Sequence, residues 1–177
     1  ILLFCKINSQ NLEKPNFVFF LVDDLGYSDI GCYGSNYYKT PSIDKLAAEG
    51  AIFTNAYSSG MVCSPSRASI LTGKYPARLR ITSAIPIKGY ARIKNGTGTP
   101  LKDADYVMNL PLEELTIAEA LKNNGYSTSS IGKWHVCKDS LFFPQNQGFD
   151  ENIGGSGRGH SANYFYPYYG KWRMAEG

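Results

Sequence analysis

A few ionisable side chains occur where predicted helices begin or predicted strands end. Two adjacent carboxylates at the end of an apolar strand lose hydration and repel one another, and a hard cation relieves both costs. A cysteine at the start of a helix lies where backbone N–H groups attract an anion. The candidate residues are the pair Asp23 and Asp24, Cys63 with Arg67, and Lys133 with His135.

The spacing of these residues suits shared pockets. Arg67 lies four positions after Cys63, one helical turn, so its guanidinium can return to the same face. Lys133 and His135 are two apart, so on an extended segment they point the same way, with Trp134 facing the core. Each residue also has an ordinary interpretation: an aspartate that caps a turn, a buried thiol, a surface arginine, a structural histidine.

The elements that must position these residues alternate between strand and helix. The apolar run Phe17–Val22 is typical of a strand buried on both faces, and it stops at the aspartate pair. A helix is predicted from Thr40-Pro41 to Gly50, with Ile43, Leu46 and Ala47 on one face. A strand over residues 52–57 then leads to a helix over residues 64–72, which Gly73 ends.

The second half of the chain continues this alternation. Residues 74–110 are rich in glycine and proline and are interpreted as a long surface excursion, which contains the glycosylation sequon Asn95-Gly96-Thr97. Thr116 and Glu119 form a capping box for a helix that ends by Gly125, and residues 127–131 follow as a strand. The pattern predicts an α/β fold with a mainly parallel sheet, which binds ligands at the carboxyl ends of its strands.

Composition limits the classes of function. The 177 residues, 43% of them hydrophobic, suffice for one globular core. A net charge of +3 without a long basic run indicates no nucleic-acid partner. No run approaches the roughly 20 apolar residues of a membrane span. The cysteines are scattered, so Cys32 and Cys137 are interpreted as small buried side chains rather than as a bridge.

Several motifs together carry a family resemblance. The segment Cys63-Ser64-Pro65-Ser66-Arg67 and the segment Gly132-Lys133-Trp134-His135 are the most specific of them. Asp23-Asp24-Leu25-Gly26, Thr40-Pro41-Ser42-Ile43-Asp44 and Gly148-Phe149-Asp150 occur in the expected order around them. Residues 16–150 thereby resemble the N-terminal part of a type I sulfatase of the alkaline-phosphatase superfamily, most like the bacterial polysaccharide sulfatases. The resemblance implies the corresponding α/β fold, incomplete at the C-terminus, for a catalytic region over residues 16–177.

The resemblance also implies a role for each site residue. Cys63 is expected to be oxidised to formylglycine by a maturation enzyme, and its hydrated aldehyde is the nucleophile. Arg67 holds a diol oxygen, Lys133 binds sulfate oxygen, and His135 orients the diol and takes a proton. Asp23, Asp24 and the oxygen derived from Cys63 bind a metal, Ca²⁺ or alternatively Mg²⁺.

The resemblance is incomplete in two places. Val136-Cys137 replaces the usual Leu-Gly after the histidine, which puts the shape of that turn in question. The family's Asp-Asn metal ligands, and its second histidine and lysine, have no counterparts here, so we expect the front portion of a longer enzyme.

Residues 1–15 are interpreted as a possible signal-peptide remnant and linker. In the Gly-rich, aromatic tail, Arg158 and His160 are candidate sugar contacts, although the tail's aromatic residues can equally pack in a core.

The expected function is hydrolysis of a sulfuric ester, with a sulfated carbohydrate or aryl sulfate as substrate. The expected location is outside the cytoplasm: periplasmic, secreted or surface, or lysosomal in a eukaryote. Two alternatives remain open at this point. One is a formylglycine-dependent phosphodiesterase or phosphonate hydrolase, and the other is a relative that binds sulfated glycans without cleaving them.

Overall fold

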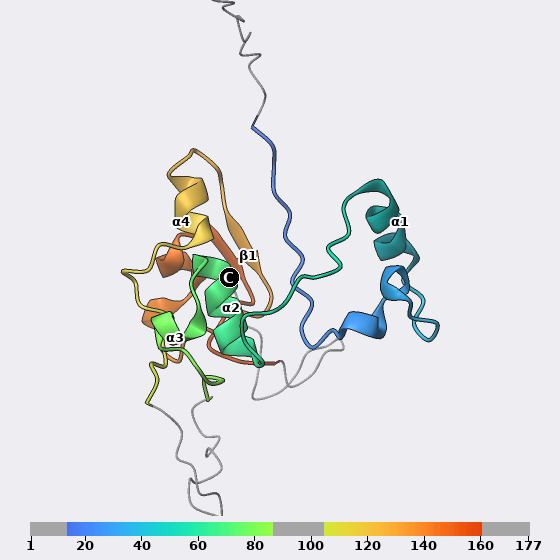
Figure 1. Ribbon diagram of the computed structural model, residues 1–177. Coiled ribbons are helices and arrows are strands. Elements are labelled where there is room, and N and C mark those ends of the chain that lie inside the picture. Colours follow the sequence, from blue (N-terminus) through green and yellow to red (C-terminus); the bar gives the residue numbers. More distant parts are fainter. Residues whose placement is uncertain (1–13, 87–104, 161–177) are drawn as a thin grey trace, which may run out of the picture. The chain divides into compact units, whose positions relative to one another are not determined.

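The computed structural model describes residues 14–86 and 105–160 (Figure 1). These residues fall into two compact units, which divide between Phe53 and Thr54 and are described separately. Three features predicted from the sequence lie outside the described residues: the possible leader remnant, the sequon at Asn95, and the aromatic cluster of the tail. None of the helices in the described ranges has the length and apolar character needed to cross a membrane.

The first unit is organised around α1, Pro41–Glu49, which follows two 3-10 turns at Tyr27–Asp29 and Gly31–Tyr33. The helix begins after Thr40 and ends at Gly50, as predicted. Asp44 ties its first turn to the preceding loop, because its carboxylate accepts from the Cys32 backbone N–H at 2.7 Å. The hydroxyl of Thr40 accepts from the Gly31 N–H at 2.8 Å.

Two predicted strands are absent from the structure. Residues 17–22 form no strand ladder, and their side chains are exposed, up to 81% at Phe20. Residues 52–57 likewise form no strand and contain a turn at Thr54 and Asn55. An extended segment becomes a strand only when a neighbour pairs with its backbone. Neither segment is part of a strand pair among the described residues, so apolar composition alone led to the wrong prediction.

The second unit contains α2 (Cys63–Thr72), α3 (Pro76–Leu79) and α4 (Ile117–Lys122). Its two strands, β1 (Ser129–Ile131) and β2 (Glu151–Ile153), pair in parallel with Ser129 opposite Glu151. Two further 3-10 turns, Ser140–Phe142 and Pro144–Gln147, connect them. The predicted capping box is confirmed: the Thr116 hydroxyl accepts from the Glu119 N–H, and the Glu119 carboxylate accepts from the Thr116 N–H.

The core of the second unit joins segments that are distant in sequence. It contains Ala68 from α2, Leu79 from α3, and Trp134 from the segment after β1, with Ile81, Ile85, Leu110, Val136 and Cys137. The prediction that residues 74–110 form a surface excursion is therefore wrong for the described ends of that range. Apolar side chains at these described ends pack inward, because burial of apolar surface does not require regular secondary structure.

Asp150 fastens the start of the small sheet. Its carboxylate accepts from the Thr128 N–H at 2.9 Å and pairs with the Lys122 ammonium at 2.5 Å. These contacts, the Lys122 hydrogen bond first, lower the pKa of Asp150. Because Thr128 and Asp150 directly precede β1 and β2, these contacts support the register in which the two strands pair. The segment that carries Lys133 begins where β1 ends.

Candidate active site

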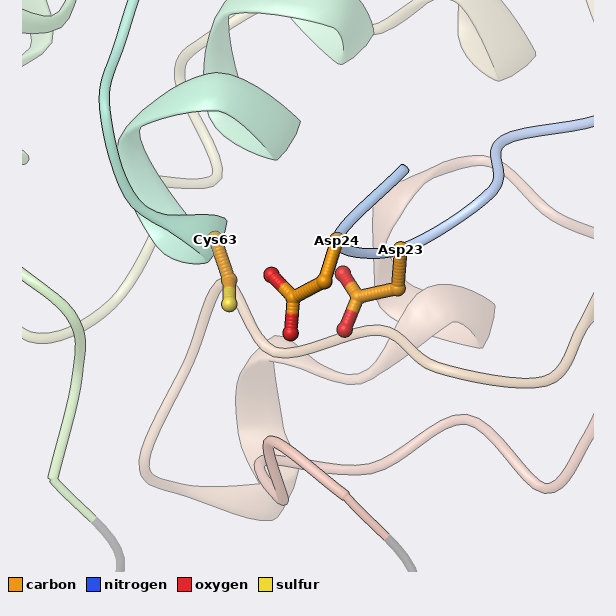
Figure 2. Close-up of side chains that lie close together, drawn as sticks. All are labelled: Asp23, Asp24 and Cys63. Carbon is orange, nitrogen blue, oxygen red and sulfur yellow. The ribbon is translucent and has the colours of Figure 1, made fainter. Parts of the chain in front are cut away.

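The two aspartates occupy a turn of the first unit rather than the end of a strand. One carboxylate oxygen of Asp23 lies within 4.8 Å of one carboxylate oxygen of Asp24, and both side chains are exposed (Figure 2). Asp24 has a φ of 55°, in the left-handed region, which aspartate tolerates better than most residues. Two converging, water-accessible carboxylates are the hard oxygen donors that Ca²⁺ or Mg²⁺ takes in proteins. The pair therefore fits part of the coordination shell of such an ion.

Cys63 is the first residue of α2 in the second unit (Figure 2). The backbone turns from extended geometry at Val62 into the helix, and the Ser66 hydroxyl holds this entry by donating to the Val62 carbonyl at 3.0 Å. Gly73 ends the helix with a φ of 68°, as predicted. The half-buried thiol consequently lies at the N-terminus of a ten-residue helix, whose dipole stabilises a negative charge.

Arg67 and Lys133 reach the same part of the second unit from different elements. The Lys133 ammonium lies 3.2 Å from the Cys63 sulfur. The Arg67 guanidinium donates to the Lys133 backbone carbonyl at 2.5 Å, and Arg67 is only 9% exposed. Arg67 thus fixes the segment that carries Lys133 against α2. The structure brings these three predicted site residues together.

His135 is buried, 6% exposed, and has a φ of 56°. Its Nε2 lies 2.9 Å from the Ile85 carbonyl oxygen, and its backbone N–H donates to the Ser156 carbonyl at 3.0 Å. The prediction that Lys133 and His135 lie on an extended segment is wrong. The strand ends at Ile131, and positive φ angles at Gly132 and His135 turn the chain.

The prediction that Trp134 faces the core is confirmed. Trp134 is 3% exposed, donates from its indole N–H to the Phe142 carbonyl at 3.0 Å, and packs edge-on against Phe149. Cys137 is fully buried, and desolvation raises the pKa of its thiol to about 12. Because Cys137 does not have a positive φ, the turn does not require glycine at this position. Cys32, by contrast, is only partly buried, and neither of these cysteines forms a disulfide.

Arg158 and His160 lie in the Gly-rich segment that follows β2. Arg158 is partly buried, and its backbone N–H donates to the Ser156 hydroxyl at 3.3 Å. His160 is exposed. Contact of either residue with a sugar stays a prediction.

Three residues around His135 were not among the candidates from sequence. Ile85 supplies the carbonyl that the imidazole contacts, and Ser64 accepts from the Ile85 N–H at 3.0 Å. A Cβ atom on Gly159 would lie 2.7 Å from the Cε1 atom of the ring. Their separation in the sequence does not indicate this proximity, and in the glycine-rich tail the sequence pointed to Arg158 and His160 rather than to Gly159.

Comparison with known proteins identifies relatives of the chain. The family model described as Sulfatase matches residues 15–174. Human arylsulfatase A is 40% identical over 144 residues, which are 80% of this chain and 25% of that protein. Human N-acetylgalactosamine-6-sulfatase is 36% identical over 162 residues, which are 91% of this chain and 28% of that protein. The chain thus spans about a quarter of the length of these curated relatives.

Two solved structures are also similar to the chain. The crystal structure of Ps i-CgsB superimposes with a TM-score of 0.61 at 35% identity, covering 73% of this chain and 25% of that one. A structure solved in complex with its substrate D-glucosamine-2-N,6-O-disulfate superimposes with a TM-score of 0.60 at 30% identity, covering 79% and 23%. The predicted α/β fold is confirmed by these similarities and by the parallel pairing of β1 and β2.

Proposed function

The chain belongs to the sulfatase family, and on this premise we propose that its protein is a sulfuric ester hydrolase with a formylglycine nucleophile. The observation that carries the proposal is the meeting of three motif residues from two distant segments. The Lys133 ammonium lies 3.2 Å from the Cys63 sulfur, and Arg67 fixes the Lys133 backbone. A thiol at a helix N-terminus with a cation beside it is a site prepared for an anionic group.

The proposed reaction begins after Cys63 is converted to formylglycine and hydrated. One diol oxygen attacks sulfur and gives up its proton, the S–O bond to the substrate breaks, and the leaving oxygen takes up a proton and departs as the alcohol. The second diol hydroxyl then loses its proton, the aldehyde re-forms, and sulfate is expelled from carbon. Water rehydrates the aldehyde. Release of sulfate is therefore an intramolecular elimination rather than a second hydrolysis.

Each neighbouring side chain has a role in this scheme. Lys133 stabilises charge on the transferred sulfuryl group, and its ammonium already lies at the nucleophile position. Arg67 restrains the Lys133 segment and adds positive charge near the diol. His135 exchanges the proton during elimination, a step suited to imidazole near neutral pH.

The family implies a divalent metal, and the Asp23 and Asp24 carboxylates suit one. From the family membership, we propose that these two residues, with the oxygen derived from Cys63, hold Ca²⁺, with Mg²⁺ as the alternative. When bound, the ion supplies positive charge that offsets the charge of the sulfate group. The close carboxylate pair in its exposed turn supports this assignment.

We propose a sulfated carbohydrate as the substrate class and an exported enzyme that depends on a formylglycine-generating partner. Relatives named N-acetylgalactosamine-6-sulfatase, and the solved complex with a disulfated glucosamine, support the carbohydrate assignment. Arg158 and His160 are the proposed sugar contacts, since the segment that carries them packs against the His135 segment.

The test compares an aryl sulfate with an aryl phosphate diester on the full-length protein. We expect greater kcat/KM on the sulfate; a preference for the diester contradicts the proposal and supports the phosphodiesterase alternative. Peptide mass spectrometry of protein from the native host is expected to show residue 63 about 18 Da lighter than cysteine. An unmodified thiol in such protein, together with glycan binding and no turnover, supports the non-catalytic alternative.

A further inference from the structure

The imidazole of His135 is restrained on more than one side within the second unit. Its Nε2 lies 2.9 Å from the Ile85 carbonyl oxygen. A carbonyl oxygen only accepts hydrogen bonds, so Nε2 must carry a proton to make this contact. In the neutral ring Nδ1 then holds the lone pair. This contact selects one tautomer of the ring.

The carbonyl that selects the tautomer is itself fixed. The Ser64 hydroxyl accepts from the backbone N–H of Ile85 at 3.0 Å, and both residues are buried. Ser64 immediately follows Cys63 at the start of α2. One short chain of contacts therefore connects the residue beside the nucleophile to the imidazole of His135.

The face of the ring is restrained by a glycine. A Cβ atom at Gly159 would lie 2.7 Å from Cε1, closer than real Cβ contacts, and 3.1 Å from each ring nitrogen, which is a tight contact. The Gly159 backbone thus packs directly on the imidazole, and a larger residue requires the ring or the Gly159 backbone to shift. The backbone bond from the His135 N–H to the Ser156 carbonyl holds the two segments together at 3.0 Å.

We propose that Ser64, Ile85 and Gly159 are positioning residues that hold His135 as the Nε2–H tautomer, so that Nδ1 is the atom that accepts the diol proton. The inference rests on the proposed function for the identity of the reaction. The positioning itself rests on the contacts alone. In the elimination step, the proton moves from the diol hydroxyl to Nδ1 as the carbon–oxygen double bond forms and sulfate leaves with the electron pair of the broken C–O bond.

The activity test uses Gly159→Ala in the full-length, formylglycine-containing enzyme. Displacement of the ring by about 1 Å is expected to lower kcat about 100-fold, with KM for an aryl sulfate little changed. Gly155→Ala is the matched control, because its Cβ would press on Asn152 and Pro144 of the same region instead of on the ring. This control is expected to lower the melting temperature while kcat per folded molecule stays at the wild-type value.

A second pair of variants tests the hydrogen-bonded side of the ring. Ser64→Ala removes the acceptor of the Ile85 N–H and is expected to lower kcat about tenfold, as for other groups that orient a functional histidine. Ser64→Thr keeps a hydroxyl and is expected to recover most of that loss. Equal losses in both variants contradict a role for the hydroxyl.

The tautomer is measured directly, without reference to turnover, by the nitrogen chemical shifts of ¹⁵N-histidine-labelled protein, with His135→Gln to assign the signals. A protonated Nε2 in the wild type and a mixed or reversed pattern in Gly159→Ala support the proposal. A protonated Nδ1 in the wild type, or a Gly159→Ala variant with wild-type shifts and kcat, overturns it. Full activity of His135→Gln would instead refute the role of His135 in the proposed reaction, whichever tautomer is found.

Discussion

Replacement of Arg67 by alanine tests whether the Lys133 segment depends on α2. The guanidinium is 9% exposed and donates to the Lys133 carbonyl at 2.5 Å. A hydrogen bond from a charged donor contributes about 1.5–3 kcal/mol, and the carbonyl left behind loses its partner in a largely buried place. We therefore expect Arg67→Ala to lower the free energy of unfolding of the full-length protein by about 2–3 kcal/mol.

The same change is expected to alter the chemistry. Without its restraint, the Lys133 segment can move away from the nucleophile, and misplacement by about 1 Å costs about 100-fold in kcat. Because Arg67 belongs to the proposed formylglycine motif, kcat must be normalised to the formylglycine content measured by mass spectrometry.

Urea denaturation followed by tryptophan fluorescence gives the stability, and Arg78→Ala is the matched control. Arg78 is an exposed arginine of α3, so its loss is expected to change the unfolding free energy by less than about 0.5 kcal/mol. The reasoning is refuted if Arg67→Ala unfolds at the urea concentration of the Arg78→Ala control and turns over at the wild-type rate per formylglycine.

Three further predictions concern the metal, the core and pH. Asp24→Asn is expected to raise the Ca²⁺ concentration required for half-maximal activity at least tenfold in chelator-treated enzyme, since one anionic ligand is lost; an unchanged requirement contradicts the metal assignment. Trp134→Ala is expected to destabilise the protein by about 3–5 kcal/mol in urea denaturation, because a buried indole and its contact with Phe149 are lost, whereas Trp134→Phe is expected to cost less. Burial raises the pKa of Cys137 from its ordinary value of 9.0 to about 12 in the folded protein, so the unfolded chain loses this proton first and stability falls as pH rises from about 9 toward 12. Cys137→Ala is expected to flatten that part of the stability–pH curve, and an equally steep curve in the variant contradicts the assignment.

Helices were predictable from the sequence because their signals are local. Thr116 with Glu119 caps α4, Gly73 ends α2, and Pro41 opens α1, and each signal acts within one turn of the chain. The strand predicted at residues 17–22 failed because pairing depends on a neighbour that composition does not identify.

The residues of the candidate site could be predicted from the sequence, whereas their contacts could not. The motifs pointed to Cys63, Arg67 and Lys133, and the structure confirms that these three meet. The surroundings of His135 were not foreseeable, because its positive φ and its contact with Ile85 come from packing between separate segments. Gly159 lies in the glycine-rich tail, yet only the three-dimensional arrangement explains why a glycine is needed there.

The contact between Lys133 and Cys63 spans 70 residues of sequence, that between Arg67 and Lys133 spans 66, and that between His135 and Ile85 spans 50. Contacts across such separations close large loops and carry an entropic cost before they stabilise anything. The ends of α2 are set by local signals, whereas the arrangement around the thiol requires the segment after β1 to pack against that helix. A correctly formed α2 is therefore not sufficient to place Lys133 beside Cys63.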